Sequence, residues 1–325
     1  MDITEGQLWE YWQKYIADHY YSPFDIRVKI QFKALAEIIK KAHNGSIVLD
    51  IGAGENVLEP LFKDAYYISL DSGAGEVGGW KYQNVDILGD VLALPVANSS
   101  VDIALLVWVL EHVNEPYIAL QEIHRILKPG GILYLLAPLF LHEHMEPYDF
   151  YRYTRSGLKY LLKKACFGEI NIKQSSGVLN ALSEIACFGT FNILSILKKG
   201  GDISKIVTVS PEGIAELEEV FKTLNKFHNS FTELDSMFIK NDINVLDGNF
   251  PTDYVCIAYK PGDLNSPEKY QDKKEVLKNI LACPQCHLAL DSSFFESGEA
   301  KTYHCKNCNK RFEFTGNNWQ FIYTS

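Results

Sequence analysis

Three acidic residues follow apolar segments of the sequence at intervals of about 20 residues. Asp50 lies just before Gly52-Ala-Gly54, Asp71 ends the next apolar segment, and Asp90 follows later. The glycines allow a tight turn in which backbone N–H groups can approach a ligand. A carboxylate at the second position can accept hydrogen bonds from both ribose hydroxyls, and one at the third can accept from the exocyclic amine of adenine. This order predicts a site for an adenosine-containing ligand.

A second concentration of reactive side chains lies in the segment LHEHMEPYDFYRY, residues 141–153. It combines two histidines, His142 and His144, with an acid and a base, Asp149 and Arg152. A hydroxyl or amine that attacks an electrophile benefits from a base whose pKa is near neutrality, and histidine is such a base. We therefore expect His144, supported by His142, to be the catalytic base. The alternative is that Asp149 and Arg152 pair to fix the loop while His144 packs or caps.

Four of the seven cysteines form two C-x-x-C turns, Cys283-Pro-Gln-Cys286 and Cys305-Lys-Asn-Cys308. This spacing is typical of a zinc site. Four thiolates complete a tetrahedron and leave no open position, so we expect the Zn²⁺ to be structural. A segment of about 50 residues cannot bury a large core, and metal binding would supply much of its folding free energy. A redox or disulfide pair is the alternative.

Alternating strand-like and helix-like segments must position these residues. The strand-like segments are apolar throughout, which predicts an α/β fold with a parallel sheet buried between helices. Ligands of such sheets bind at the carboxyl ends of the strands, where Asp50 and Asp71 stand. The expected strands are 46–51, 66–71, 101–107, 132–137, 169–175 and 254–259, and the expected helices include 115–127 and 154–167.

The remaining segments suggest a division of the chain. Residues 1–45 predict a helical layer on the sheet, because apolar and aromatic side chains recur every three or four positions. Residues 46–262 would form the ligand-binding domain, interrupted at about 177–250 by a mostly helical insertion. The polar segment 263–275 is expected to be a linker. Residues 276–325 would form a small zinc-ribbon domain.

Composition limits the classes of protein and partner. The chain has 325 residues, 47% apolar and 22% charged, which fits about two globular domains. Its formal charge is −10, whereas proteins that bind nucleic acid through phosphates usually carry a basic surplus. RNA is therefore not favoured as a partner. No signal-peptide pattern begins the chain, and four thiols suited to a metal favour a reducing compartment, so we expect a cytoplasmic location.

One apolar stretch, 178–197, has the length of a membrane span. It contains Glu184, and a carboxylate within a span is costly in lipid. We therefore expect no transmembrane segment here, but a buried helix or an apolar lid.

Five motifs resemble class I S-adenosylmethionine-dependent methyltransferases, among which the type 11 family is the most similar group. The motifs are VLDIGAGENVLEPLF, YISLD, ILGDVLAL, VDIALLVWVLEHV and HRILKPGGILYLLAP. The resemblance runs from about Ser46 to Phe167, and more loosely to Lys260. It implies a Rossmann-like sheet of seven strands with helices on both faces. The last two strands would form an antiparallel hairpin that contains the helical insertion.

The resemblance also implies roles for individual residues. Gly52 and Gly54 would pass under the methionine part of S-adenosylmethionine, with Asp50 near its amino group. Asp71 would hold the ribose. Many members of the family have a third glycine in this loop, where this chain has Glu55-Asn56.

Further along the chain, Asp90 and the backbone of Val91 would bind adenine. Glu111 and His112 would lie just past the fourth strand, near the cofactor. The loop that contains His144 resembles an H-x-x-P-x-D-[FY]-x-R-[FY]-T element of a type 11 subgroup often associated with modification of glycans and small molecules. The resemblance thus implies methylation of an oxygen or nitrogen of a small molecule or glycan.

The C-terminal segment, which opens with LACPQC, resembles the small zinc-ribbon activator subunits of RNA and protein methyltransferases. This resemblance implies either a built-in stabiliser or a substrate-docking module. Two alternatives to a small-molecule or glycan methyltransferase stay open. One is an RNA methyltransferase that docks its substrate on the ribbon, and the other is a non-catalytic cofactor-binding scaffold whose ribbon recruits a partner. The oligomeric state is not predicted.

Overall fold

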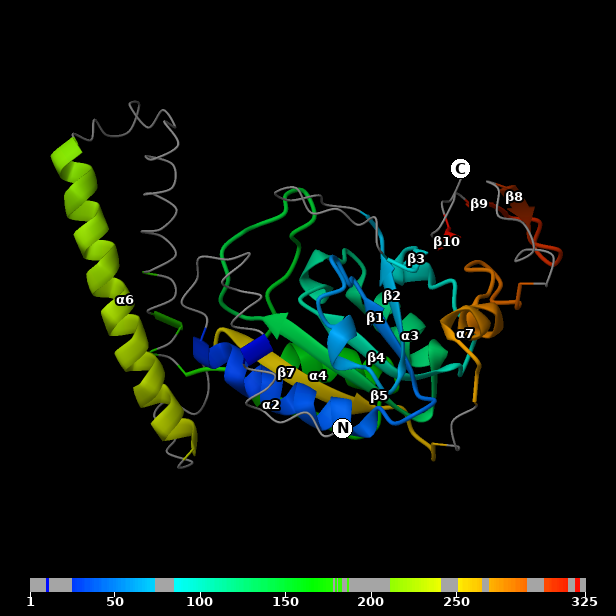
Figure 1. The fold of residues 1–325 in the computed structure, drawn as a ribbon, viewed down its shortest axis with the longest axis horizontal. Helices are drawn as coiled ribbons and strands as arrows, with labels where there is room; N and C mark the ends of the chain where they lie inside the picture. Colours follow the sequence, from blue (N-terminus) through cyan, green and yellow to red (C-terminus); the bar gives the residue numbers. More distant parts are fainter. Residues whose placement is uncertain are drawn as a thin grey trace.

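A single mixed sheet of eight strands forms the centre of the protein, for which we use a computed structural model (Figure 1). The structure describes residues 10–11, 25–73, 85–177, 179, 181–182, 186, 211–240, 251–264, 269–290, 301–314 and 319–321. The strand order is β10-β3-β2-β1-β4-β5-β7-β6. The strands are β1 (Ile47–Ile51), β2 (Tyr66–Asp71), β3 (Ile87–Leu88), β4 (Val101–Val107), β5 (Leu127–Pro138), β6 (Ile170–Gln174), β7 (Asp253–Tyr259) and β10 (Trp319–Gln320).

The predicted seven-stranded fold is confirmed. Strand β7 pairs antiparallel with both β5 and β6, and all other pairs in the sheet are parallel. The eighth strand, β10, was not expected. Its two residues extend the sheet beyond β3, so the C-terminus of the described chain continues the edge of the central sheet.

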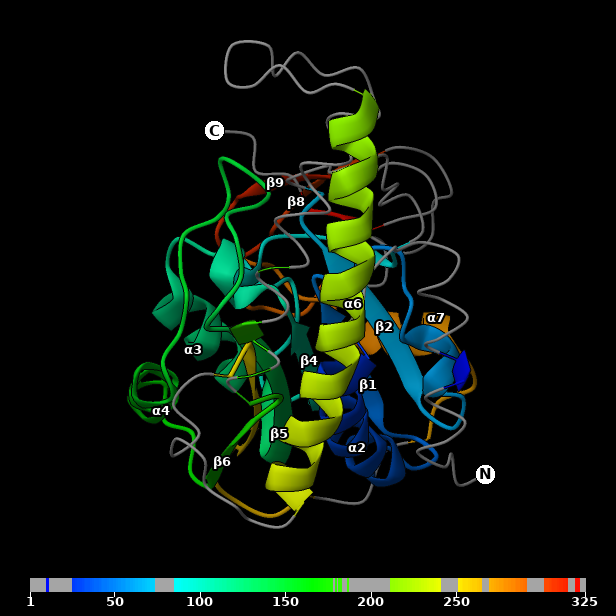
Figure 2. The ribbon, with the colours of Figure 1, turned by 90° about the vertical axis from the view of Figure 1, so that its left-hand side faces the viewer.

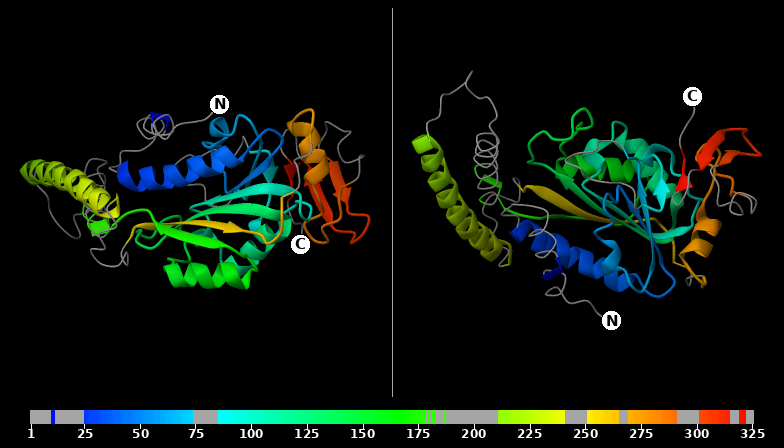
Figure 3. Two further views of the ribbon diagram at one scale, coloured as in Figure 1. Left: turned by 90° about the horizontal axis from the view of Figure 1, so that it is seen from below. Right: turned by 45° about the horizontal axis from the view of Figure 1, so that its top comes forward.

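Side chains alternate between two cores because successive residues of a strand point to opposite faces. In β1, Leu49 lies in one hydrophobic cluster and Val48 in the other. Helix α2 (Asp25–Lys41) covers the Val48 face, and α3 (Pro116–Ile126) and α4 (Arg155–Lys164) cover the opposite face (Figure 3). This arrangement confirms the expected helices on both faces of the sheet.

The helical insertion lies between β6 and β7 in the chain, as expected. Its described part is mainly α6 (Pro211–Lys240), which lies at one end of the molecule (Figure 1) and therefore in front of the sheet in Figure 2. Most of the apolar stretch 178–197 lies outside the described residues. Among the helices that the structure describes, none combines the length and the apolar character needed to cross a membrane.

The C-terminal region, residues 269–290, 301–314 and 319–321, packs on the opposite end of the sheet (Figure 1). It contains α7 (Lys273–Ile280), β8 (Lys301–His304) and β9 (Arg311–Phe314). Helix α7 begins inside the stretch expected to be a linker. Its buried side chains join the same hydrophobic cluster as β1 and β4. The region therefore shares the core of the sheet, although the division into domains stays a prediction.

Ile280→Ala tests this shared core. Ile280 is 1% exposed, and removing its side chain should lower the free energy of unfolding by about 2–5 kcal/mol. Because the cluster is continuous, we expect one unfolding transition, measured by calorimetry and by near-ultraviolet circular dichroism. Lys278→Ala, on the exposed side of the same helix, should change stability by less than about 0.5 kcal/mol. Two separate transitions, with only the smaller one shifted by Ile280→Ala, would contradict a shared core.

Candidate functional site

The carboxyl end of β2 holds Asp71 in a fixed position. Its Oδ2 accepts a hydrogen bond from the N–H of Gly54 (3.0 Å), and its Oδ1 accepts one from the N–H of Gly73 (2.8 Å). The residue is 6% exposed, and burial raises the pKa of its carboxyl although these two bonds oppose the shift. The N–H of Ser72 also acts on this carboxylate, which keeps the capacity to accept from a hydroxyl group.

Asp50 lies beside Asp71, on the neighbouring strand. It is buried, and the hydroxyl of Tyr67 donates to its Oδ2. Burial raises the pKa of Asp50 to about 7, and the charge of Asp71 adds to the shift. Since neither a lysine nor an arginine among the described residues forms an ion pair with it, this edge of the sheet presents two acidic side chains without a basic partner, and a cationic ligand would favour their ionised forms.

The glycine loop after β1 is shaped by packing. Gly52 has a φ of 75°, and a Cβ atom added to it would lie 2.3 Å from Cγ2 of Val109. The N–H groups of Gly52 and Ala53 donate to the carbonyl of Leu70 (2.7 and 3.0 Å). In this structure those two groups are bonded to β2, so the glycine is required by the turn and by the approach of Val109.

Asp90 begins the short helix η3 (Val91–Ala93). Its Oδ1 accepts from the N–H of Leu92 (2.9 Å), so one oxygen caps the turn while the side chain is exposed. The preceding residue, Gly89, donates its N–H to the carbonyl of Asp71 (2.9 Å). The structure thus brings Asp50, Asp71 and Asp90 to the same edge of the sheet, in the expected order.

The C-terminal region holds the segment that carries Asp90. The ion pair between Lys273 Nζ and Asp86 Oδ2 (2.7 Å) lies at one end of this segment. Three backbone hydrogen bonds also connect the two parts, from Phe321 to Leu88 (2.8 Å), from Ala97 to Ile280 (2.7 Å) and from Ala282 to Pro95 (3.0 Å). The position of Asp90 therefore depends on the C-terminal region.

A loop after β5 folds onto the short helix η4 (Leu110–His112), which follows β4. Hydrogen bonds connect them from Phe150 N–H (2.9 Å) and Tyr151 N–H (3.2 Å) to Glu111 O, and from Tyr153 Oη to Leu110 O (2.9 Å). Nδ1 of His112 lies 2.7 Å from the carbonyl oxygen of Tyr148. These contacts bring the ring of His144 against that of His112, with centroids 4.7 Å apart and planes at 84°.

Arg152 stabilises this loop. Its guanidinium donates to both oxygens of Asp149 (2.6 and 2.8 Å) and to the carbonyl groups of Leu141 (2.9 Å) and His142 (2.7 Å). The hydrogen bonds from Arg152 lower the pKa of Asp149 to about 2. The Asp149–Arg152 pair thus has the loop-fixing role that the sequence left as an alternative, and the N–H of His144 also donates to Asp149 (2.8 Å).

Glu111 is fully buried behind the two histidines. Its side chain is 0% exposed, and neither carboxylate oxygen has a hydrogen-bond partner among the described residues. Burial raises the pKa of Glu111 to about 8. The donor atoms of Glu111, His112 and His144 all lie within 4.8 Å of one another. No local sequence pattern predicts that these three side chains meet, although they follow β4 and β5, whose carboxyl ends are adjacent.

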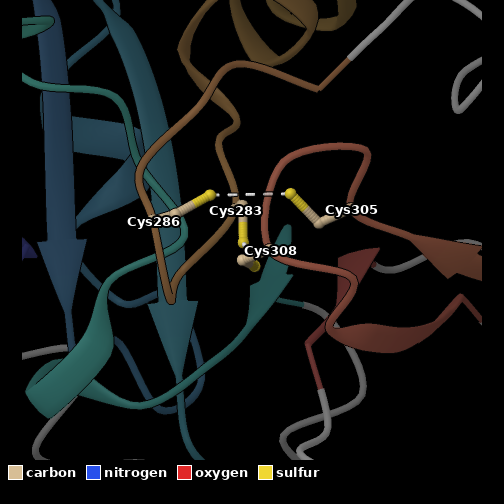
Figure 4. Close-up of side chains that lie close together, drawn as sticks. All are labelled: Cys283, Cys286, Cys305 and Cys308. Atoms are coloured by element: carbon tan, nitrogen blue, oxygen red, sulfur yellow. Dashed lines mark hydrogen bonds between the residues drawn. The ribbon is translucent and has the colours of Figure 1, made fainter.

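The four predicted zinc ligands lie together (Figure 4). The Sγ atoms are 3.6 Å apart in Cys283 and Cys308, and 3.5 Å apart in Cys286 and Cys305. A tetrahedral zinc with Zn–S bonds of about 2.3 Å separates its sulfurs by about 3.8 Å, whereas a disulfide needs about 2.05 Å. The cluster is therefore consistent with a zinc site.

The two C-x-x-C turns have the same backbone geometry. In each, the first cysteine donates its N–H to the carbonyl five residues later and accepts from the N–H four residues later. The distances are 2.9 and 2.7 Å at Cys283, and 2.9 and 2.8 Å at Cys305. His287 and Asn309 follow the second cysteines and have φ values of 58° and 57°. This repetition presents the four sulfurs from two matching turns.

A further pocket lies at the opposite edge of the sheet. It is lined by residues at the amino ends of β1, β4 and β5, among them Ser46, Asp102 and Gly130. None of the predicted site residues lines it. Because ligands of such sheets bind at the carboxyl ends, we do not assign the site to this pocket.

Comparison with known proteins identifies one domain. Residues 49–135 match the family described as "Methyltransferase domain". Over 109 residues the chain is 37% identical to a demethylmenaquinone methyltransferase of Renibacterium salmoninarum, covering 32% of this chain and 45% of that protein. Over 101 residues it is 35% identical to a tRNA (carboxymethyluridine(34)-5-O)-methyltransferase of Mus musculus, covering 30% of this chain and 15% of that protein. The chain thus spans less than half the length of either relative.

Among solved structures, a SAM-dependent methyltransferase from Archaeoglobus fulgidus aligns over 77% of this chain and 100% of that chain. The TM-score is 0.43 and the sequence identity is 16%.

Gly52→Ala tests the packing of the glycine loop. The substitution should lower the free energy of unfolding by about 2–5 kcal/mol, because the positive φ and the contact with Val109 both oppose a Cβ atom. Adding Val109→Ala removes only the contact, so the double variant should be more stable than the sum of the two single effects by about 1–3 kcal/mol. Urea denaturation measures all three variants. Strict additivity would contradict the contact.

Proposed function

We propose, from the premise that this chain contains a class I S-adenosylmethionine-dependent methyltransferase domain, that it methylates an oxygen or nitrogen of a small molecule or glycan. The observation that carries the proposal is the buried carboxylate of Asp71, fixed at the end of β2 by the N–H groups of Gly54 and Gly73. A carboxylate in this position can accept both ribose hydroxyls of an adenosine-containing cofactor.

The other cofactor contacts follow from the same edge of the sheet. Asp50 would attract the amino group of the methionine part, and Gly52 and Gly54 would form the turn beneath it. Asp90 and the backbone of Val91 would bind the adenine ring. When bound, S-adenosylmethionine supplies a methyl group on a positively charged sulfur. The side chains on the chain itself bind and orient the reactants, which contributes most to an in-line displacement.

The acceptor would bind beside the loop after β5. We propose that His144, with His142 next to it, activates the acceptor. Nδ1 of His144 lies 3.0 Å from the carbonyl oxygen of His142, so a neutral His144 that donates there keeps a lone pair on Nε2. Arg152 and Asp149 hold this loop rigid, which keeps the imidazole in place.

The C-terminal region would act as a built-in stabiliser with one zinc on Cys283, Cys286, Cys305 and Cys308. Its hydrogen bonds to the segment that carries Asp90 support this role. Thiolate ligands need a reducing compartment, which is consistent with a cytoplasmic location.

An RNA acceptor is the second candidate, because one relative is named as a tRNA methyltransferase. The formal charge of −10 weighs against it. A methylation assay with radiolabelled S-adenosylmethionine, run on small molecules, glycans and total RNA, separates the candidates.

Titration calorimetry with S-adenosylhomocysteine tests the cofactor site. Asp71→Asn should weaken binding by about 10- to 150-fold, or roughly 1.5–3 kcal/mol, because one charge-assisted partner of the ribose is lost. Asp263→Asn makes the same charge change at an exposed position far from the carboxyl edge and should bind like wild type.

Two results would contradict the cofactor site. No binding by the wild-type protein would favour the non-catalytic scaffold, and equal affinities in all three proteins would show that Asp71 does not hold the ribose. A thermal melt of Asp71→Asn checks that the variant is folded.

A further inference from the structure

We propose that Glu111, His112 and His144 bind one divalent cation at the acceptor side of the site, which we call the Glu-His-His site. The three residues each offer one donor atom, and these atoms lie within 4.8 Å of one another. They come from η4 and from the loop after β5, which the backbone hydrogen bonds hold together. This site is separate from the four-cysteine cluster.

The state of Glu111 is the first observation that points to a ligand. A carboxylate that is 0% exposed normally has hydrogen bonds or a basic partner, because burying an unpaired charge is costly. Neither oxygen of Glu111 has a hydrogen-bond partner from another residue in the described part of the chain, although its own backbone N–H acts on the carboxylate. The nearest complementary group is Nε2 of His112, 4.0 Å from Oε1. A cation between them would satisfy the carboxylate.

The two histidines are arranged as metal ligands usually are. Metal-bound histidines donate the other ring N–H to a carbonyl or carboxylate, which fixes the tautomer and the ring orientation. Nδ1 of His112 lies 2.7 Å from the carbonyl of Tyr148, and Nδ1 of His144 lies 3.0 Å from the carbonyl of His142. In both rings Nε2 is therefore the atom with a free lone pair.

The surrounding charges favour a cation. Among the described residues, the charges of Asp149, Asp253 and Arg152 act on Glu111. The guanidinium of Arg152 is engaged by Asp149 and by backbone carbonyls. The site therefore carries a surplus of negative charge before a ligand binds.

One carboxylate and two imidazoles suit Mn²⁺, Fe²⁺, Co²⁺ or Zn²⁺ better than Mg²⁺ or Ca²⁺, which prefer oxygen ligands. Bonds of about 2.0–2.2 Å to a common ion require the most distant donors to close by up to roughly 1.5–2 Å. Three protein ligands leave open coordination positions, in contrast to the closed set of four thiolates. An open position can take an oxygen of the acceptor.

The role of the cation rests on the proposed methyltransferase function and changes the part of His144: with the cation bound, Nε2 of His144 is a ligand, so the ion, and not His144 itself, activates the acceptor. An acceptor hydroxyl bound to the cation has a lowered pKa, so its O–H bond breaks more easily and the proton passes to solvent water. The oxygen electron pair forms the bond to the methyl carbon. The carbon–sulfur bond breaks, its electron pair stays on sulfur, and the sulfonium becomes a neutral thioether.

Metal counting and Mn²⁺ titration on the full chain test the proposal. Elemental mass spectrometry counts the zinc in the purified protein, and electron paramagnetic resonance follows added Mn²⁺. We expect wild type to hold one zinc on the thiolates and one further cation, either bound Mn²⁺ or a second zinc. Glu111→Gln and His144→Ala should each lose that second equivalent, with an affinity for Mn²⁺ lowered more than about 10-fold. The matched control is Glu143→Gln, which removes an exposed carboxylate next to His144 and should bind like wild type.

Stability provides a readout independent of activity. Mn²⁺ should raise the melting temperature of wild type and of Glu143→Gln by a few degrees, and should leave Glu111→Gln unchanged. Without added metal, Glu111→Gln should be at least as stable as wild type, because a buried unpaired carboxylate is removed. Equal metal content and equal Mn²⁺ binding in all four proteins would overturn the Glu-His-His site.

Titration of S-adenosylhomocysteine into the same proteins separates this inference from the proposed function. If the wild-type protein binds S-adenosylhomocysteine but no second cation, the proposed function stands and the metal site is overturned. If the wild-type protein binds the cation but not S-adenosylhomocysteine, the metal site stands and the proposed function is overturned. If Glu111 contacts the cofactor directly, Glu111→Gln weakens nucleoside binding in chelator-treated protein, and the assignment of Glu111 to a cation fails.

Discussion

Buried carboxylates without basic partners are the constraint on which this site depends. Asp50, Asp71 and Glu111 lie at the carboxyl ends of neighbouring parallel strands, and no described lysine or arginine forms an ion pair with them. Burial raises the pKa of each carboxyl, to about 7 for Asp50 and about 8 for Glu111. Such an arrangement is costly in a ligand-free protein. A ligand with an ammonium group, hydroxyl donors or a bound cation offsets that cost, and perturbed carboxyls gathered at one edge are typical of functional sites.

The rest of the molecule keeps these groups in place. Backbone hydrogen bonds fasten the loop after β5 to η4, and Arg152 stabilises the loop itself, so the rings of His112 and His144 lie against each other. At the other end, the C-terminal region adds β10 beside β3 and shares the core of the sheet. Fixing donors in advance lowers the ordering cost of binding. The C-terminal region thus helps to position the segment that carries Asp90.

Most strands of the sheet, the acidic residues at their ends and the cysteine cluster could be predicted from the sequence, because each shows a local pattern of residue types and spacing. The acids at the ends of apolar segments and the two C-x-x-C turns are local patterns, and the structure brings each set together. Features set by contacts between distant segments were missed. Strand β10 has two residues, too few to form a pattern, and it is a strand only because β3 lies beside it. The approach of Val109 to Gly52 and the meeting of Glu111 with His144 depend on how neighbouring strands end, which no local pattern encodes.

The proposed site places the buried carboxyl of Asp50 beside the ammonium group of the cofactor. Proton release on cofactor binding tests this placement most directly. At pH 6.5 the amino group of S-adenosylmethionine is charged, and an Asp50 with a pKa of about 7 is mostly protonated. An ammonium placed beside it lowers that pKa, so binding should release a fraction of one proton, measured by calorimetry in buffers of different ionisation enthalpy. The release should vanish in Asp50→Asn. Binding without any proton transfer in the wild-type protein would contradict the claim that a buried, protonated carboxyl receives the cationic end of the cofactor.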